Sequence, residues 1–185
     1  MADRRLVLLA GAALAAGCAS VSDPGKDAAK RKEIDASVDD SLKDLFASAP
    51  DAHKVADRAQ AVLVFPKVIT AGLFVGGSYG DGSLRKGGST VGYYSVAGGS
   101  VGLLAGAQSR TMFLFFMTPK ALGDFEGSSG WTVGGNASAV VVDAGAMARM
   151  DMSKTPDVIA MVRDQQGLMA SLSLDGTKIT KLNLM

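Results

Sequence analysis

Hydrophobic positions along residues 27–48 recur with the spacing of an α-helix. Apolar side chains fall on one stripe of this segment, and charged side chains occupy the remaining positions. The pattern predicts an amphipathic helix from Asp27 to about Ser48. A second helix is predicted to begin at Pro50, because proline suits the first position of a helix. The apolar stripe of the first helix consists of Ile34, Val38, Leu42, Leu45 and Phe46.

The middle of the chain has the pattern of β-strands, with apolar runs and alternating positions. Pro66 is expected to end the first strand, because proline lacks the N–H that a strand ladder needs. The run TMFLFFM is almost wholly apolar, so both of its faces are expected to be buried. The predicted strands are 62–65, 70–79, 90–107, 111–117 and 131–142.

Turn and cap signals separate these strands. The dipeptides Asp81-Gly82 and Gly87-Gly88 predict turns. Thr118 precedes Pro119 and is predicted to cap a short helix that extends to Phe125.

The C-terminal segment carries competing signals. Residues 155–157 (Thr-Pro-Asp) have the composition of a helix start, whereas residues 158–162 alternate as a strand does. Further along, the dipeptide 175–176 (Asp-Gly) lies between the apolar runs 168–174 and 178–184. That arrangement predicts a β-hairpin.

A short motif of valine, two glycines and a small polar residue recurs at 75–78, 96–100 and 133–136. Glycine inside a strand usually marks a bulge, a bend or a close approach of two backbones. A phosphate-binding loop would instead require a helix directly after the glycines, and none is predicted there. The expected fold class is therefore α+β, with N-terminal helices packed on a strongly curved, glycine-rich antiparallel sheet or small β-barrel.

The first residues have the pattern of a secretory signal. Basic residues precede a short apolar run at 6–14, and small residues follow up to Cys18. Residues 14–18 (Leu-Ala-Ala-Gly-Cys) resemble the bacterial lipobox, with Ala15 at the position where leucine is usual. The alternative is an ordinary signal peptide that is cut near Ala16.

Cysteine usage favours the lipoprotein interpretation. Cys18 is the only cysteine of the chain, and lipidation would explain an unpaired cysteine in an exported protein. We expect residues 1–17 to be a lipoprotein signal peptide and residues 18–26 to be a lipidated tether. By resemblance to known lipoprotein sorting, Ala19 in place of aspartate favours the outer membrane of the bacterial cell envelope.

Side chains that carry chemistry are scarce. His53 is the only histidine, and with Cys18 lipidated no Cys/His pair, Ser/His/Asp set or zinc site can be built. The 19 Lys and Arg residues nearly balance the 18 Asp and Glu residues, so the chain has no long-range field that would gather nucleic acid. We therefore expect a binding module without catalytic residues, metal ligands or cofactors, rather than an enzyme.

The stretch 59–82 resembles the core signature of the SYLF domain family. It contains a Pro-Lys-Val step at 66–68 and a Gly-Gly-x-x-Gly-x-Gly end at 76–82. The glycine-rich block 98–106 and the block 167–176 (GLMASLSLDG) are similar to the later blocks of the family. The resemblance extends over roughly residues 50–185.

This resemblance implies one SYLF-like domain over residues 27–185 that binds membrane lipids, and it implies a strand at 158–163. For this chain we expect binding of anionic headgroups, since basic residues lie near the anchor and at turns. The alternative is an envelope scaffold that binds another protein or peptidoglycan. The candidate lipid-binding residues are Lys26, Lys30, Arg31, Lys32, Lys67, Arg85 and Lys86.

Overall fold

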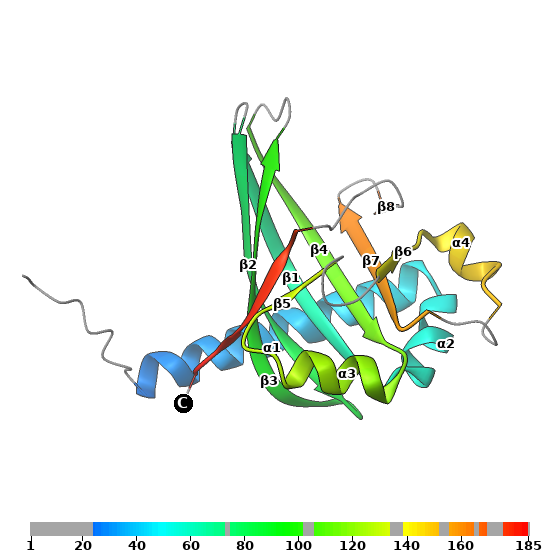
Figure 1. The fold of residues 1–185 in the computed structure, drawn as a ribbon, viewed down its shortest axis with the longest axis horizontal. Helices are drawn as coiled ribbons and strands as arrows, with labels where there is room; N and C mark the ends of the chain where they lie inside the picture. The colour runs from blue at the N-terminus through cyan, green and yellow to red at the C-terminus, as the bar shows by residue number, and fades with distance from the viewer. Residues whose placement is uncertain are drawn as a thin grey trace, which may run out of the picture.

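The computed structural model has helices packed on one strongly curled sheet, which confirms the predicted α+β class with a curved sheet (Figure 1). The structure describes residues 24–72, 75–101, 106–133, 139–151, 156–164, 167–169 and 176–184. Its helices are α1 (Pro24–Ser48), α2 (Asp51–Arg58), α3 (Pro119–Glu126) and α4 (Ala144–Ala148). Its strands are β1 (Ala61–Gly72), β2 (Val75–Lys86), β3 (Ser89–Val101), β4 (Gly106–Phe116), β5 (Trp131–Thr132), β6 (Ala139–Val141), β7 (Val158–Asp164), β8 (Gly167–Met169) and β9 (Lys178–Leu182).

The strands lie side by side in the order β5-β9-β3-β2-β1-β4-β7-β6, and β8 also pairs with β7. All of these pairs are antiparallel except β6 with β7. The four central strands β3, β2, β1 and β4 extend beyond their neighbours, because the pairing of β9 with β3 stops at Ala97 and that of β7 with β4 stops at Thr111 (Figure 1). We call this four-stranded extension the finger.

The two faces of the sheet bury two separate hydrophobic clusters. On the inner face, alternate residues such as Leu63 and Leu114 pack with α3, β5 and β9. On the outer face, the intervening residues such as Val64 and Phe113 pack under α1, α2 and α4. Residues 112–116 are all buried, which confirms that the apolar strand is covered on both sides.

The predicted helices are present. α1 begins at Pro24, three residues before the predicted start at Asp27, and it buries Ile34, Val38 and Leu45 of the predicted stripe. α2 begins at Asp51, one residue after the predicted start at Pro50, which is its N-cap residue. α3 has the predicted cap, since the Thr118 hydroxyl accepts a hydrogen bond of 3.2 Å from the Ala121 N–H. The short helix α4 was not predicted; the Asp143 carboxylate accepts a hydrogen bond from the Ala146 N–H at its start.

The predicted end of the first strand at Pro66 is wrong. β1 continues to Gly72 and accommodates the proline in a bulge, where its register with β2 shifts between Val64 and Ile69. The predicted turn at Asp81-Gly82 is also wrong, because both residues lie inside β2 opposite β3. The predicted turn at 87–88 is confirmed, with positive φ angles of 57° and 83° at its two glycines.

Three predicted strands are each divided into two. Residues 70–79 contain the end of β1 and the start of β2, which run antiparallel with Gly72 opposite Gly76. Residues 90–107 contain most of β3 and the start of β4, and residues 131–142 contain β5 and β6. β5 and β6 lie at opposite ends of the strand order, so the last of these predictions joined two distant elements.

The first two glycine motifs do not coincide with the bulges. The first two motifs lie opposite each other in the β2–β3 ladder, where Gly77 pairs with Gly99 without a register shift. Backbone close approach instead occurs at Gly80 and Gly82, where an added Cβ would meet the bulged backbone of β1. The glycines of the third motif lie outside the described residues.

At the C-terminal end, the strand implied at 158–163 is confirmed as β7. The predicted hairpin around Asp175-Gly176 is wrong, because the described residues of its two arms pair elsewhere. β8 pairs with β7, whereas β9 pairs with β3 and β5. Residues 170–175 lie outside the described residues.

The predicted signal peptide, Cys18 and the first part of the predicted tether also lie outside the described residues. Within the described part of the chain, no helix has both the length and the apolar character to cross a bilayer.

Candidate functional site

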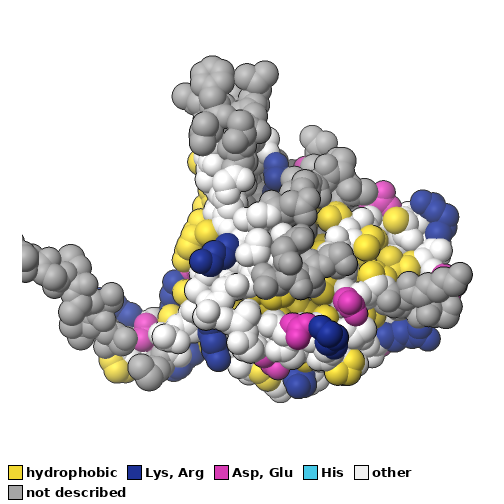
Figure 2. Space-filling model, viewed as in Figure 1, with side chains coloured by type: hydrophobic (Ala, Val, Ile, Leu, Met, Phe, Trp, Pro, Cys, Tyr) yellow, Lys and Arg dark blue, Asp and Glu magenta, His cyan; other side chains and the backbone are white. Residues whose placement is uncertain are grey.

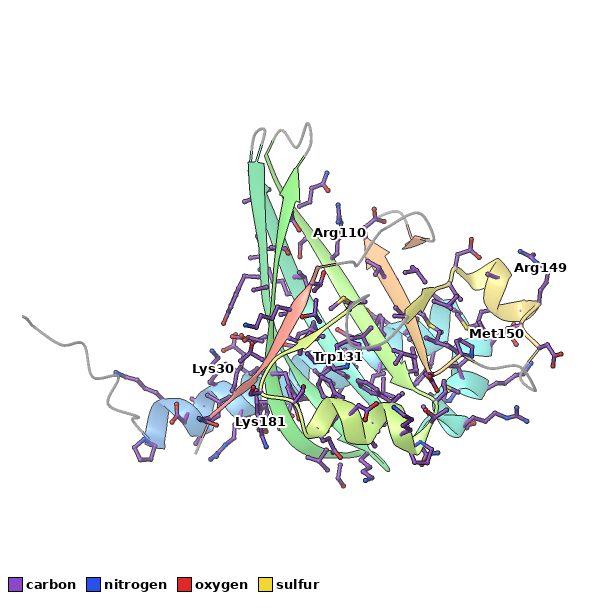
Figure 3. The ribbon with its side chains drawn as sticks, in the orientation of Figure 1. Lys30, Arg110, Trp131, Arg149, Met150 and Lys181 are labelled. Carbon is purple, nitrogen blue, oxygen red and sulfur yellow. The ribbon has the colours of Figure 1, made fainter. Side chains whose placement is uncertain are left out.

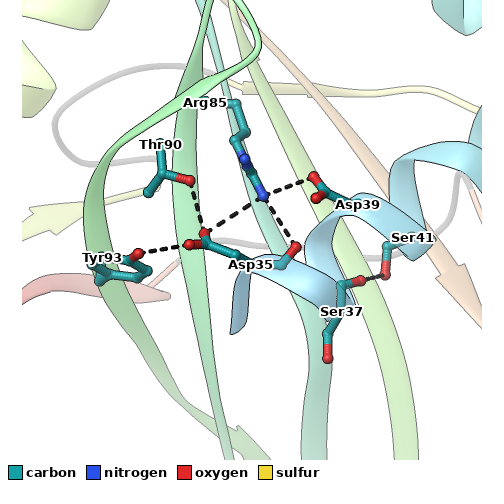
Figure 4. A network of polar contacts seen from close by, with 7 residues as sticks. All are labelled: Asp35, Ser37, Asp39, Ser41, Arg85, Thr90 and Tyr93. Atoms are coloured by element: carbon teal, nitrogen blue, oxygen red, sulfur yellow. Dashed lines mark hydrogen bonds and ion pairs between the residues drawn. The ribbon is translucent and has the colours of Figure 1, made fainter. Parts of the chain in front are cut away.

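Arg85, one of the predicted lipid-binding residues, lies at the centre of a polar network that holds α1 on β2 (Figure 4). Its Nη2 atom is 2.7 Å from Oδ1 of Asp39 and 3.5 Å from Oδ1 of Asp35, and it donates a hydrogen bond of 3.0 Å to the Asp35 carbonyl. The Arg85 side chain is only 12% exposed. Its charge therefore serves helix docking rather than an external ligand.

The same network reaches β3 through Asp35 (Figure 4). The Asp35 carboxylate accepts hydrogen bonds of 2.7 Å from the Thr90 hydroxyl and 2.8 Å from the Tyr93 hydroxyl. Partial burial, followed by the hydrogen bond to Asp35, raises the pKa of Tyr93 to about 12. The Asp35 carboxylate of α1 thus contacts β2 through Arg85 and β3 through Thr90 and Tyr93.

Two more predicted residues fasten the N-terminal half of α1. Lys30 forms an ion pair of 2.7 Å with Asp81 of β2. Arg31 donates a hydrogen bond of 3.2 Å to the Leu184 carbonyl, just after β9. Tyr79 donates a hydrogen bond of 2.6 Å to the Asp81 carboxylate, which together with burial raises the pKa of Tyr79 to about 12. Three side chains that the sequence predicted to bind lipid, Lys30, Arg31 and Arg85, therefore hold α1 on the sheet.

The remaining four predicted residues are exposed. Lys26 and Lys32 lie in the first half of α1, Lys67 lies in the β1 bulge, and Lys86 lies at the end of β2. On the face shown in Figure 2, basic side chains are spread over several elements. The candidates that stay close to Cys18 in sequence and exposed to solvent are Lys26 and Lys32.

A pocket of about 320 Å³ opens between α1, the middle of β4 and the C-terminal end of β7. By the alternation of β4 and β7, Ser109 and Arg163 lie on the outer face with α1, whereas the neighbouring Arg110 and Asp164 side chains lie on the inner face. Figure 3 shows Arg110 on β4 near the end of β7. The residues that line the pocket are Ser41, Asp44, Ser109, Arg110, Thr111, Phe113, Arg163 and Asp164.

The outer side of the finger carries uncharged side chains. Ile69 and Tyr79 are directly opposite each other on β1 and β2 and are 44% and 53% exposed. Their neighbours across the four strands are small residues on the same side. We call this surface the outer finger face; it consists of Ile69, Ala71, Gly77, Tyr79, Ala97, Gly99, Ala107 and Ser109.

The pocket and the outer finger face were not predicted from the sequence. The pocket combines residues from three elements far apart in the chain, and residues 108–110 lie between two segments that were predicted as separate strands. Alternation of small residues along the finger was visible, but it does not reveal which face a helix covers.

Among the described residues, no group of three or more histidine, cysteine, aspartate or glutamate side chains has the arrangement of a metal site. His53 is exposed and stacks on the ring of Phe46, with ring centroids 3.9 Å apart. This contact gives the imidazole a packing role on α2.

Comparison with known families adds the identity of the domain. Residues 97–183 match the family model described as Ysc84, Las17-binding protein actin regulator. The matched region runs from the end of β3 through β9 and includes both strands that border the pocket. A comparison with curated proteins gives no significant match. Through residues 97–183 the chain is therefore identified as carrying the SYLF (Ysc84) domain, the family that its sequence resembles.

Proposed function

We propose that this protein is a lipoprotein of the bacterial cell envelope whose SYLF domain binds membrane lipids with anionic headgroups, without catalysing a reaction. The matched family is described as a Las17-binding protein actin regulator, which supports the proposal that this domain is a binding module. The observation that carries the membrane part is the exposure of Lys26 and Lys32 on α1, which begins at Pro24, shortly after the lipobox-like Cys18.

Electrostatics and acylation would act together in this arrangement. Each basic residue close to an anionic leaflet contributes about 1 kcal/mol, and each buried CH₂ of an acyl chain contributes about 0.8 kcal/mol. Cleavage after residue 17 would leave Cys18 at the start of the mature chain, with residues 18–23 as its link to α1, which begins at Pro24 and includes the last three residues of the predicted tether. Ala19 is consistent with sorting to the outer membrane.

Vesicle sedimentation tests the proposed headgroup preference. The chain from residue 19 keeps every residue that the structure describes and lacks the anchor. We expect it to pellet with phosphatidylglycerol vesicles at low salt and not with phosphatidylcholine vesicles. The double substitution K26A/K32A should weaken this binding by tenfold or more, which corresponds to about 1.4 kcal/mol. Absence of pelleting at low salt would refute lipid binding.

The matched control is Lys120→Ala on α3, an exposed lysine whose Nζ is 2.6 Å from Asp124. This variant also loses one positive charge, but on α3 rather than α1, so its vesicle binding should stay unchanged.

Anchoring is tested separately by labelling cells with a fatty acid. The intact protein should carry the label and Cys18→Ser should not.

A protein partner is the second candidate function, because the description of the matched family names a protein that its members bind. In that case the domain would serve as an envelope scaffold. Sedimentation that is independent of vesicle charge, together with co-purification of one envelope protein in stoichiometric amount, would favour this alternative.

A further inference from the structure

We propose that the pocket between α1, β4 and β7, together with the outer finger face, binds one aminophospholipid molecule. The headgroup occupies the pocket and the acyl chains lie on the finger. This inference rests on the proposed lipid-binding function and adds the site and the class of lipid to it.

The pocket presents both signs of charge on the outer side of the sheet. Arg163 of β7 supplies a guanidinium, and Asp44 of α1 supplies a carboxylate. Neither side chain forms an ion pair among the described residues, so both charges remain available to a ligand. A guanidinium binds phosphate through two parallel hydrogen bonds, and a carboxylate accepts hydrogen bonds from an ammonium group.

Hydroxyl groups complete the polar lining. Ser41 donates its hydroxyl proton to the Ser37 carbonyl at 2.8 Å, which leaves the Ser41 oxygen free to accept a hydrogen bond from an ammonium group (Figure 4). Ser109 lies across the pocket on β4 and is exposed. The volume of about 320 Å³ is at the lower end of small-molecule pockets and suits a headgroup rather than a whole lipid.

The outer finger face continues from the pocket without a charged residue. Ser109 lines the pocket and is opposite Ile69, and the next outward pair on these strands is Ala107 with Ala71. The described strand continues from Ser109 to Gly106, roughly 10 Å at the rise of a β-strand. An exposed apolar surface beside a polar pocket matches the division of a phospholipid into headgroup and acyl chains.

The balance of charge selects the type of headgroup. A headgroup with only negative charge would bring its phosphate toward Arg163 but would also be repelled by Asp44. A headgroup in which an ammonium lies next to the phosphate satisfies both side chains. The pocket therefore favours phosphatidylethanolamine over phosphatidylglycerol. Lys26 and Lys32 instead attract anionic bilayers in general and do not discriminate between types of headgroup.

Titration calorimetry with monomeric short-chain lipids tests this proposal, with the chain from residue 19 as the protein. Dihexanoyl-phosphatidylethanolamine should bind at least tenfold more tightly than dihexanoyl-phosphatidylglycerol. Asp44→Asn should remove this preference, and Arg163→Gln should weaken both lipids at least tenfold. Ile69→Asp should weaken binding of the lipids but not of O-phosphoethanolamine, which has no acyl chains.

Matched controls exclude general damage. Asp40→Asn changes the same charge on exposed α1 surface outside the pocket, and Val91→Asp changes another exposed apolar residue, 50% exposed on β3. Both controls should bind as the parent chain does, and circular dichroism should confirm that all variants are folded. Equal affinity for the two lipids, or unchanged binding by Asp44→Asn and Arg163→Gln, would overturn the site. If anionic vesicles still pellet the protein in that case, the proposed function stands without this site.

Discussion

Individual glycines of the sheet have different roles that depend on what lies opposite them. At Gly82 an added Cβ would collide with the Val64 carbonyl oxygen and the Phe65 ring, because the β1 backbone comes close to Gly82 where its bulge begins. At Gly99, on the outer finger face, nothing lies within 4 Å of such a Cβ. Glycine is thus required at position 82, whereas position 99 has room for a side chain.

We predict that Gly82→Ala destabilises the protein by about 1–3 kcal/mol, the usual cost of inserting a methyl group into a packed interior. The matched control Gly99→Ala should change stability by less than about 1 kcal/mol and can raise it, since alanine restricts the unfolded chain. Urea unfolding followed by circular dichroism measures both. Equal stability of the two variants would contradict the close approach at Gly82.

The Tyr93 hydroxyl makes the free energy of unfolding depend on pH in the alkaline range. Its pKa is about 12 in the folded chain and near the ordinary value of 10 in the unfolded chain, so folding favours the protonated hydroxyl. This stabilisation is complete below pH 10 and is lost as the pH rises from 10 to 12, where the unfolded chain releases the proton first.

We therefore predict that the urea midpoint falls between pH 10 and pH 12 and that Tyr93→Phe has a shallower fall. The comparison with the parent chain is needed because Tyr79, with a pKa also raised to about 12, contributes in the same range. A Tyr93→Phe profile parallel to that of the parent would show that Tyr93 does not contribute.

At the scale of elements, Arg85 is one of the residues that hold α1 in position on the sheet. Arg85 contacts Asp35 and Asp39, and it lies opposite Val62 of β1 in the ladder. The contacts of a charged hydrogen-bonding group of this kind contribute about 1.5–3 kcal/mol to stability.

We predict that Arg85→Ala lowers stability by that amount and speeds amide hydrogen exchange in α1 more than in β4. Lys86→Ala is the control, because Lys86 is the exposed neighbour on the same strand, and it should change stability by less than about 0.5 kcal/mol. Uniform faster exchange over the whole chain would argue against a specific docking role.

Element positions were predictable to the extent that local signals specified them. The stripe of α1, the Thr118 cap and the turn at 87–88 depend on neighbours in sequence, and all three were found. The end of β1 was missed because a bulge absorbed Pro66, which a strand ladder without bulges would exclude. Apolar runs such as 70–79 contain chain reversals that hydrophobic periodicity does not mark.

At the scale of the whole molecule, the class of fold was predictable and the strand order was not. Alternating apolar runs and glycines indicated a curved sheet, but the position of β9 between β3 and β5 depends on contacts distant in sequence. The basic residues were recognised by charge alone. Sequence cannot show that Lys30 and Arg85 have aspartate partners from another element, nor that Arg163 and Asp44 share a pocket.

The place of β9 has a consequence for how the chain folds as it is synthesised. Residues 178–182 bridge β3 and β5, so the strand that holds Trp131 gains its neighbour only after those residues have left the ribosome. Pairings over such long loops form slowly. β5 therefore lacks its partner strand until β9 has been synthesised, and the sheet is completed late.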